Sequence, residues 1–215
     1  TSLFADYGYL KTFHYIKLSY PSTSFKALFD LFCLFKGLKL GSLVETEKQT
    51  LKLQYKQMLP CYLPLPQSQI EYYMDLAFQE SQIAIKNNEV PIGAIITRNK
   101  EVIATGYNQT LNQQNITKHA EIVALEKATQ IIGSHRLNEC DLYVTVEPCL
   151  MCCGAIIHSR IRRLIFGATE NKTGAVISQY QVFNNLTVNH HTEVIGPINQ
   201  KLYSTQLREF FKQKR

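Results

Sequence analysis

No apolar run in this sequence approaches the ~18 uninterrupted residues that a membrane-spanning helix needs. The 215 residues include 10 Gly and 7 Pro, which is too few for a fibrous chain. Only 19% of the residues are charged and 45% are hydrophobic, which excludes a largely disordered chain. At ~150 residues per domain, these limits favour one full globular domain with an appendage.

The six cysteines lack the spread over distant loops that a disulfide framework would show. Three of them, Cys149, Cys152 and Cys153, fall within five residues. A chain of this length also folds without such cross-links. The clustering therefore indicates metal binding or catalysis in a reducing compartment.

Residues 1–67 contain no Arg, and they carry 8 basic and 4 acidic groups of a chain whose net charge is +6. Four charges interrupt the apolar stretch at residues 25–40, which argues against a membrane span and a signal-peptide core. Three prolines at residues 59–66 predict a linker. We therefore expect an irregular extension over residues 1–67, interpreted as a targeting segment or an upstream translation, and a folded domain over residues 68–215.

From Ser68 onward, helical and strand patterns alternate, which predicts an α/β fold. Ser68 is expected to cap the first helix and Pro148 to open a later one. The expected helices cover residues 68–88, 120–132, a segment from 148, and a C-terminal segment with Tyr203, Leu207, Phe210 and Phe211 on one face. The expected strands cover residues 91–97, 101–107, 142–146, 163–167 and 193–196.

Two short motifs carry the chemistry, and each stands at the start of an expected helix. The first is His119-Ala120-Glu121, and the second is Pro148-Cys149-Leu150-Met151-Cys152. Cys149 and Cys152 are three residues apart and share one helical face, where the positive helix end favours thiolates. One imidazole and two thiolates leave one tetrahedral position open, which is typical of a catalytic zinc rather than a structural one.

Glu121 stands too close to His119 to be a comfortable fourth ligand, yet it can reach a zinc-bound water. A carboxylate there can take a proton from the water and later pass protons to a leaving amine. Either motif alone would be weak evidence. Together they match the H-x-E…P-C-x-x-C signature of the zinc deaminases.

Beyond these motifs, the chain from about Ile70 to its end resembles the bacterial-type tRNA-specific adenosine deaminases. The resemblance is carried by Val90-Pro91-Ile92-Gly93-Ala94, Gly106-Tyr107-Asn108, His119-Ala120-Glu121-Ile122, the strand and turn 142–152, Ile156-Ile157-His158-Ser159-Arg160, Phe166-Gly167-Ala168 and Lys172-Thr173-Gly174. It implies a cytidine-deaminase-like three-layer α/β/α fold with a mixed five-stranded sheet. It also implies conversion of the wobble adenosine of a tRNA anticodon loop to inosine, with release of ammonia.

The resemblance further implies one Zn²⁺ per subunit, a homodimer, tRNA as the partner, and neither a membrane nor an organic cofactor. It matches His119, Cys149 and Cys152 to the zinc ligands and Glu121 to the proton-transfer residue. Asn108 matches an Asn that contacts the target nucleotide. Where the family often has Arg-Asp, this chain has Thr169-Glu170, and Glu170 keeps the charge on a longer side chain for a ribose contact.

Basic residues gather in two places, after the second motif and along the C-terminal helix. Taken singly, each is best interpreted as part of a solvated face. As sets they could contact RNA phosphates, and we assign Arg208 and Lys212 to substrate binding. The two sets are Arg160, Arg162 and Arg163, and Lys201, Arg208, Lys212, Lys214 and Arg215.

Two other functions stay open at this point. One is a zinc deaminase of a free base or nucleoside, of the guanine or cytosine type. The other is an inactive, zinc-stabilised RNA-binding module, against which Glu121 argues, since a structural site has no use for that carboxylate. We expect a cytoplasmic protein, or an organellar one if residues 1–67 are a transit segment.

Overall fold

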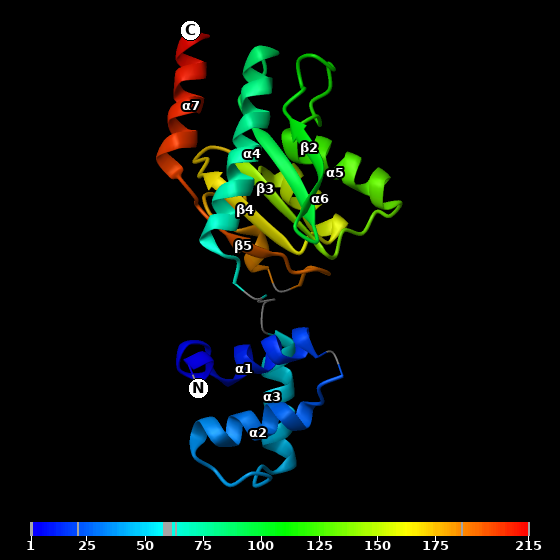
Figure 1. Ribbon diagram of the computed structural model, residues 1–215, viewed down its shortest axis with the longest axis vertical. Helices are drawn as coiled ribbons and strands as arrows, with labels where there is room; N and C mark the ends of the chain where they lie inside the picture. Colours follow the sequence, from blue (N-terminus) through cyan, green and yellow to red (C-terminus); the bar gives the residue numbers. More distant parts are fainter. Residues whose placement is uncertain (1, 21, 58–61, 63, 186, 215) are drawn as a thin grey trace. The chain divides into compact units, whose positions relative to one another are not determined.

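The computed structural model describes residues 2–20, 22–57, 62, 64–185 and 187–214. The chain divides into two compact units, Thr1–Pro64 and Leu65–Arg215 (Figure 1). Of the linker predicted at residues 59–66, residues 59–61 and 63 lie outside the described residues. Each unit has a hydrophobic core of its own.

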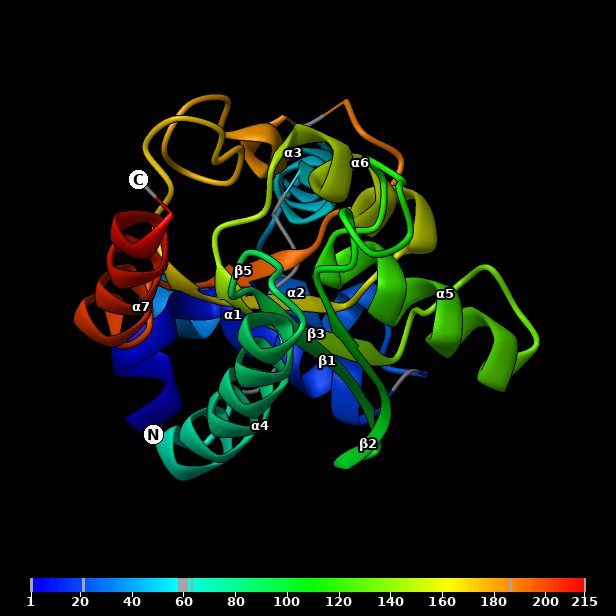
Figure 2. The same cartoon turned by 90° about the horizontal axis from the view of Figure 1, so that it is seen from above.

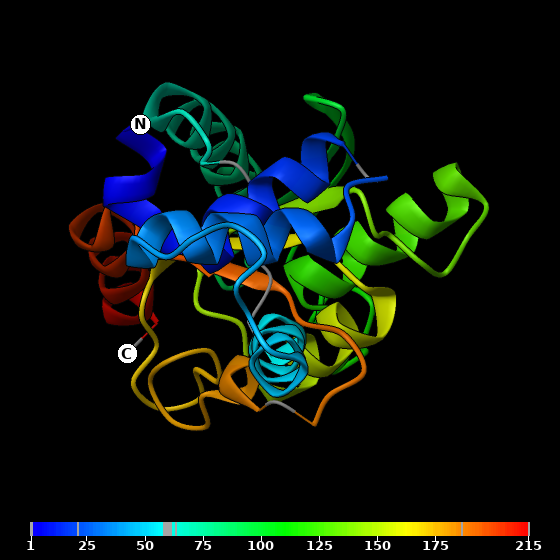
Figure 3. The ribbon, with the colours of Figure 1, turned by 90° about the horizontal axis from the view of Figure 1, so that it is seen from below.

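The first unit consists of helices, so the expectation of an irregular extension was wrong. α1 spans Ser2–Ser19, α2 spans Phe25–Lys36 and α3 spans Glu45–Gln57. α1 lies beside α2, and α3 packs across α2 (Figure 3). The buried core of this unit comprises Phe13, Leu28, Cys33, Leu43 and Leu51.

The charges that interrupt the apolar stretch at residues 25–40 explain this packing. In α2, Phe25, Leu28 and Phe32 recur at helical spacing and pack in the core. Lys26 Nζ pairs with Asp30 Oδ2 at 2.9 Å on the exposed side. Residues 25–36 of the stretch thus form an amphipathic helix, and none of the described helices combines the length and apolarity needed to cross a membrane.

The second unit contains a mixed five-stranded sheet, as predicted. Its order is β2-β1-β3-β4-β5. β1 pairs antiparallel with both β2 and β3, whereas β3, β4 and β5 run parallel. The strands span Gly93–Arg98 (β1), Glu101–Tyr107 (β2), Cys140–Val146 (β3), Arg163–Ala168 (β4) and Glu193–Ile195 (β5).

Helices cover both faces of this sheet, which confirms the predicted three-layer fold (Figure 2). α4 (Gln67–Lys86) and α7 (Gln200–Gln213) cover one face, and their core includes Met74, Ile95, Tyr143 and Tyr203. α5 (Ala120–Ile132) and α6 (Leu150–Ser159) cover the other, over a core that includes Ala124, Val144, Ile156 and Phe166. A short 3-10 helix spans Val182–Asn184.

Two predicted helix starts were wrong by one or two residues. α4 begins at Gln67 and its N-cap residue is Pro66, so Ser68 lies inside the helix. α6 begins at Leu150 after Cys149, whose extended backbone (φ −74°, ψ 173°) makes it the N-cap residue. Pro148 therefore precedes the helix, and its carbonyl accepts a hydrogen bond from the Ala175 N–H at 2.9 Å.

Two strand glycines let helices approach the sheet closely. A Cβ at Gly93 in β1 would collide with the backbone of α4 at Ala77 and Ser81. A Cβ at Gly106 in β2 would collide in the same way with the backbone of α5 at Ala120, on the opposite face. Because the obstacles are backbone atoms, no side-chain rotation can relieve them.

We predict that Gly93→Ala lowers the free energy of unfolding by about 1–3 kcal/mol, since α4 must move away from β1. Gly154→Ala is the matched control, because a Cβ at Gly154 in α6 meets open space. That change should stabilise the protein by about 0.5–1 kcal/mol. Urea unfolding measures both, and equal stabilities for the two variants would contradict the packing argument.

Candidate metal centre and active site

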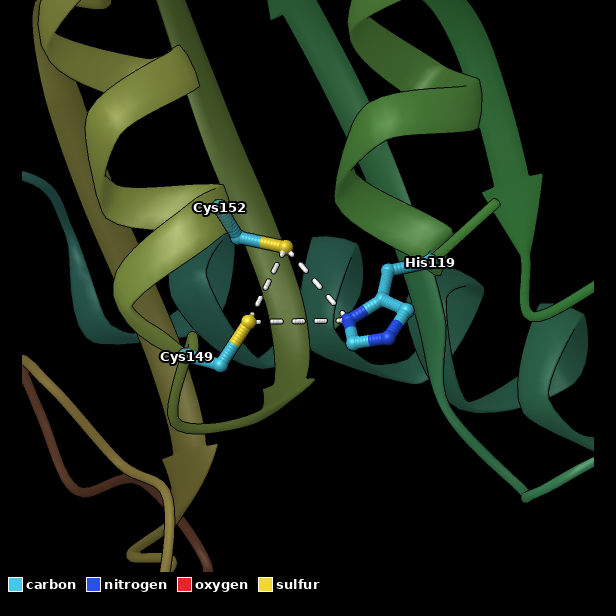
Figure 4. Close-up of side chains that lie close together, drawn as sticks. All are labelled: His119, Cys149 and Cys152. Atoms are coloured by element: carbon cyan, nitrogen blue, oxygen red, sulfur yellow. Dashed lines mark hydrogen bonds between the residues drawn. The ribbon is translucent and has the colours of Figure 1, made fainter. Parts of the chain in front are cut away.

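His119, Cys149 and Cys152 come from the starts of two neighbouring helices. His119 has an extended backbone (φ −71°, ψ 156°) and directly precedes α5 as its N-cap residue. Cys149 takes the same position before α6, and Cys152 follows within the first turn. Because α5 packs against α6, the three side chains point toward one another (Figure 4).

The three donor atoms have the spacing of a tetrahedral zinc site. His119 Nδ1 lies 3.6 Å from Cys149 Sγ and 3.6 Å from Cys152 Sγ, and the two sulfurs are 3.7 Å apart. Tetrahedral angles with ordinary zinc bond lengths give about 3.6 Å between nitrogen and sulfur and about 3.8 Å between sulfurs. The donor set therefore fits a metal ion that keeps one position for another ligand.

The cluster already favours thiolate at one cysteine. The hydrogen bond with Cys152, opposed by burial and helped by His119, lowers the pKa of Cys149 to about 4. The same hydrogen bond, together with burial, raises the pKa of Cys152. The contact with Cys149 raises the pKa of His119 against the effect of burial. Metal binding must therefore displace the proton of the Cys152 thiol.

Glu121 lies in the first turn of α5, two residues after His119, and is only 3% exposed. Its Oε2 is buried and has no hydrogen-bond partner among the described residues. Burial raises the pKa of its carboxyl to about 7. A buried carboxyl oxygen without a partner is costly, so this group is suited to a ligand or a transferred proton beside the cluster.

Comparisons with known proteins agree with this geometry. The family model for MafB19-like deaminases matches residues 68–215. The chain is 41% identical over 138 residues to the tRNA-specific adenosine deaminase of Rickettsia bellii, covering 63% of this chain and 95% of that protein. Identity to the enzyme of Agrobacterium fabrum is 41% over 144 residues, covering 67% and 95%. The chain belongs to the tRNA-specific adenosine deaminase family.

A solved structure of a tRNA:A34 deaminase, which performs A-to-I editing at the wobble position of tRNA, is also similar. It is 39% identical, with a TM-score of 0.59, covering 65% of this chain and 99% of that chain. The resemblance to tRNA-specific adenosine deaminases and the fold class inferred from sequence are thus confirmed.

In this tRNA-specific adenosine deaminase family member, Asn108 supports the helix that begins after His119. Asn108 follows β2 and is 4% exposed, and its Oδ1 accepts the Ala120 N–H at 2.9 Å. His119 makes no side-chain cap bond, so Asn108 supplies the N-terminal hydrogen bond of α5 instead. This bond occupies the carboxamide oxygen, and no described residue accepts from its Nδ2.

Glu170 belongs to a loop that lies directly against the turn that carries Cys149. Its backbone carbonyl accepts the Gly174 N–H at 2.8 Å, and its Oε1 accepts the Lys172 N–H at 2.9 Å. Gly174 in turn forms an isolated β-bridge with Cys149. The structure therefore brings Glu170 and the cluster to one end of the sheet.

Two buried carboxylates were missed by the sequence analysis. Glu147 holds the loop beside Cys149, and Glu89 holds the loop after β2. Glu89 is fully buried and accepts the N–H groups of Leu111 and Asn112, both at 2.8 Å. Glu147 is 4% exposed and accepts hydrogen bonds from the loop after β4. The available signal was a lone acid between apolar neighbours, as in Val146-Glu147-Pro148.

The structure contradicts the role that the sequence predicted for two residues of the first basic set. Arg163 is 5% exposed and its Nε donates to Glu193 Oε2 at 2.7 Å. Arg162 Nε donates to Asp141 Oδ1, also at 2.7 Å. These two arginines join neighbouring strands by ion pairs, so the expectation of phosphate contacts was wrong for Arg162 and Arg163.

Arg215 of the second basic set lies outside the described residues, whereas the end of α7 lies at the same end of the sheet as the His119, Cys149 and Cys152 cluster. Arg208 and Lys212 are exposed near the end of α7. Lys214 Nζ donates to Asn88 Oδ1, which places that end beside the end of α4. Asn112, in the loop that leads to His119, donates to the Asn87 carbonyl at 3.3 Å.

We predict that His119→Ala and Cys149→Ala weaken zinc binding by more than about 100-fold, because each removes a ligand. Glu121→Gln should keep one zinc per chain, since Glu121 is not a ligand. Cys153→Ala is the matched control, because the Cys153 thiol is buried and donates to the Pro148 carbonyl instead. Metal analysis after dialysis gives the stoichiometries. A zinc-free Glu121→Gln protein would show that its role is misassigned.

Proposed function

We propose that this protein deaminates the wobble adenosine of a tRNA anticodon loop to inosine and releases ammonia. The observation that carries the proposal is the buried, unpartnered carboxyl oxygen of Glu121 beside a cluster of three donor atoms. Three donors leave a position for a reactant, and a carboxyl poised near neutral pKa can move protons there.

His119, Cys149 and Cys152 would hold one Zn²⁺ per chain. A zinc ion in such a site lowers the pKa of water from 15.7 to about 7, which supplies a nucleophile at neutral pH. The site needs no organic cofactor, because the reaction adds water and removes ammonia with no change of oxidation state.

Glu121 handles the protons in this proposal. It takes one proton from the water that attacks C6 of adenine and gives it to the ring nitrogen N1. It then passes the second proton of that water to the amino group leaving C6, so ammonia departs and inosine keeps hydrogen on N1. The base must leave its stack to reach a buried carboxylate, and an anticodon loop presents such a base at low cost.

Other residues of the site take substrate-binding roles in this proposal. The Nδ2 group of Asn108 contacts the target nucleotide, since its Oδ1 is occupied by the Ala120 N–H. Glu170 contacts the ribose from its loop beside Cys149. Arg208 and Lys212 contact phosphates from the end of α7. The Asn108→Ala variant tests the nucleotide contact of Asn108. Weaker tRNA binding with zinc content unchanged would support this role, and unchanged tRNA affinity would refute it.

The active protein is a homodimer in this proposal. Exposed apolar side chains stand in the loop before α5 and at the start of α6. They include Leu111 (63% exposed), Ile116 (86%) and Leu150 (51%). A second copy would cover them and add surface for tRNA. The mass of a single chain in sedimentation equilibrium at assay concentrations would refute the dimer.

The activity resides in residues 68–215 in this proposal, and residues 1–67 are dispensable for it. Leu65 packs into the core of the second unit, so a chain that begins at Leu65 is the proper truncation. It should deaminate tRNA as the full chain does, and an inactive but folded truncation would refute the division. The protein acts in the cytoplasm, or in an organelle if residues 1–67 direct it there, and cell fractionation separates the two.

We predict that the full chain converts the wobble adenosine of unmodified tRNA, which sequencing reads as guanosine after the reaction. Glu121→Gln should lower the rate by about 10²–10⁴-fold, because the proton shuttle is lost. Free adenosine, guanine and cytidine should be poor substrates. Faster turnover of a free base would favour the free-base alternative, and a fully active Glu121→Gln variant would refute the mechanism.

We predict that Arg208→Glu with Lys212→Glu weakens tRNA binding and flattens its salt dependence by about one unit of slope per lost contact. The matched control is Lys100→Glu with Arg136→Glu, which changes the net charge equally. Lys100 lies in the β1–β2 turn and Arg136 follows α5. Both positions are at the end of the sheet opposite the His119, Cys149 and Cys152 cluster. Fluorescence anisotropy across a salt series measures both. Equal slopes for the two double variants would contradict the assigned contacts.

A further inference from the structure

The loop between β4 and the 3-10 helix is organised around one carboxylate, that of Glu147. Its Oε1 accepts backbone N–H groups from Val176 at 3.0 Å, Ile177 at 2.7 Å and Ser178 at 2.9 Å. Its Oε2 accepts the Glu170 N–H at 2.9 Å and the Ser178 hydroxyl. Glu147 therefore joins both ends of the loop segment 170–178.

The same loop is fixed to the turn that carries the metal-ligating cysteines. Gly174 forms a β-bridge with Cys149, and the Ala175 N–H donates to the Pro148 carbonyl at 2.9 Å. A Cβ at Gly174 would collide with the carboxylate of Glu147. The loop thus lies in contact with the ligand turn on one side.

The tip of the loop faces solvent. Asn171, Lys172 and Thr173 are exposed, whereas residues 174–176 are buried. An exposed tip on a buried, hydrogen-bonded base is a rigid element presented to whatever approaches the metal centre.

We propose that Glu147 is a positioning residue, which holds the exposed tip at residues 171–173 in place as a wall of the RNA-binding site. This inference rests on the proposed function, since it takes the approaching molecule to be an RNA loop. Glu147 does not touch the reacting atoms in this account. Its effect is exerted through the backbone of the loop, so it contributes to substrate binding rather than to proton transfer.

The pattern of donors makes Glu147 different from Glu89, the other buried loop anchor. Both oxygens of Glu147 accept backbone N–H groups, which cannot turn round to accept a hydrogen bond. At Glu89, one oxygen accepts the N–H groups of Leu111 and Asn112, and the other accepts the Thr110 hydroxyl at 3.1 Å. A hydroxyl can rotate and accept instead, so an amide can replace the carboxylate at Glu89 but not at Glu147.

The experiment compares Glu147→Gln with Glu89→Gln as the matched control in the full-length protein. For Glu147→Gln, we expect the KM for tRNA to rise about tenfold while kcat changes less than about threefold, since binding is lost uniformly. Zinc should stay at one per chain. Hydrogen exchange should quicken by more than about tenfold in the peptide that covers residues 170–178. Glu89→Gln should leave all four measurements unchanged.

A second variant keeps the test decisive if Glu147→Gln does not fold. Ser178→Ala removes one side-chain donor and leaves the four backbone donors, so a rise in KM of about two- to threefold is expected. An unchanged KM in a variant whose loop exchanges faster would overturn the positioning role. Loss of zinc from folded Glu147→Gln would overturn it too, by showing that Glu147 acts on the ligand turn. Inactivity of the unaltered protein on tRNA would refute the proposed function itself.

Discussion

The starts of α5 and α6 must approach closely enough to bring three ligand atoms within 3.7 Å of one another. Much of the second unit serves that requirement. The absence of a side chain at Gly106 lets α5 lie directly on β2, and the buried Ala120 and Ala124 keep the interface thin. Both helices also direct their positive ends toward the cluster, which favours the thiolates and the nearby carboxylate.

Two buried glutamates near this cluster have the same carboxyl group but different surroundings, and their roles differ for that reason. Burial raises the pKa of Glu121 to about 7, because few hydrogen bonds stabilise its charge. Burial acts in the same direction on Glu147, but hydrogen bonds from Ser178, Ile177 and Glu170 outweigh it and hold its pKa below the ordinary value. The first can exchange protons near neutral pH, and the second remains a permanent anion that organises a backbone.

The parts of the site that could be read from the sequence are those encoded locally. His119-Ala120-Glu121 and the Pro148–Cys152 segment each sit at a helix start, so a few adjacent residues suffice to place their side chains. The roles of Glu89 and Glu147 depend on partners more than 20 residues away, which no local pattern indicates. Arg163 was misread for the same reason, because its partner Glu193 lies on another strand.

The helical structure of the first unit was not predicted, and the reason is different. Its apolar residues were interpreted by composition and by the charges between them, and two of those charges, Lys26 and Asp30, pair on the exposed side of α2. The second unit was predicted well because its periodicities of helix and strand alternate clearly between residues 67 and 213. Helix starts were the weak point there, since Pro66 and Cys149 cap with backbone geometry and not with a side-chain oxygen.

The separation of the ligands along the chain has a consequence for the unfolded state. Cys149 and Cys152 are three residues apart, whereas His119 lies 30 residues earlier and joins them only when α5 packs on α6. An unfolded chain therefore keeps a two-thiol chelate while it lacks the imidazole. A metal ion that binds both the folded and the unfolded chain stabilises the fold only by the difference between its two binding free energies. A metal ion held by this cluster would thus change the free energy of folding by less than its binding free energy for the folded protein, and the imidazole of His119 would contribute to that difference.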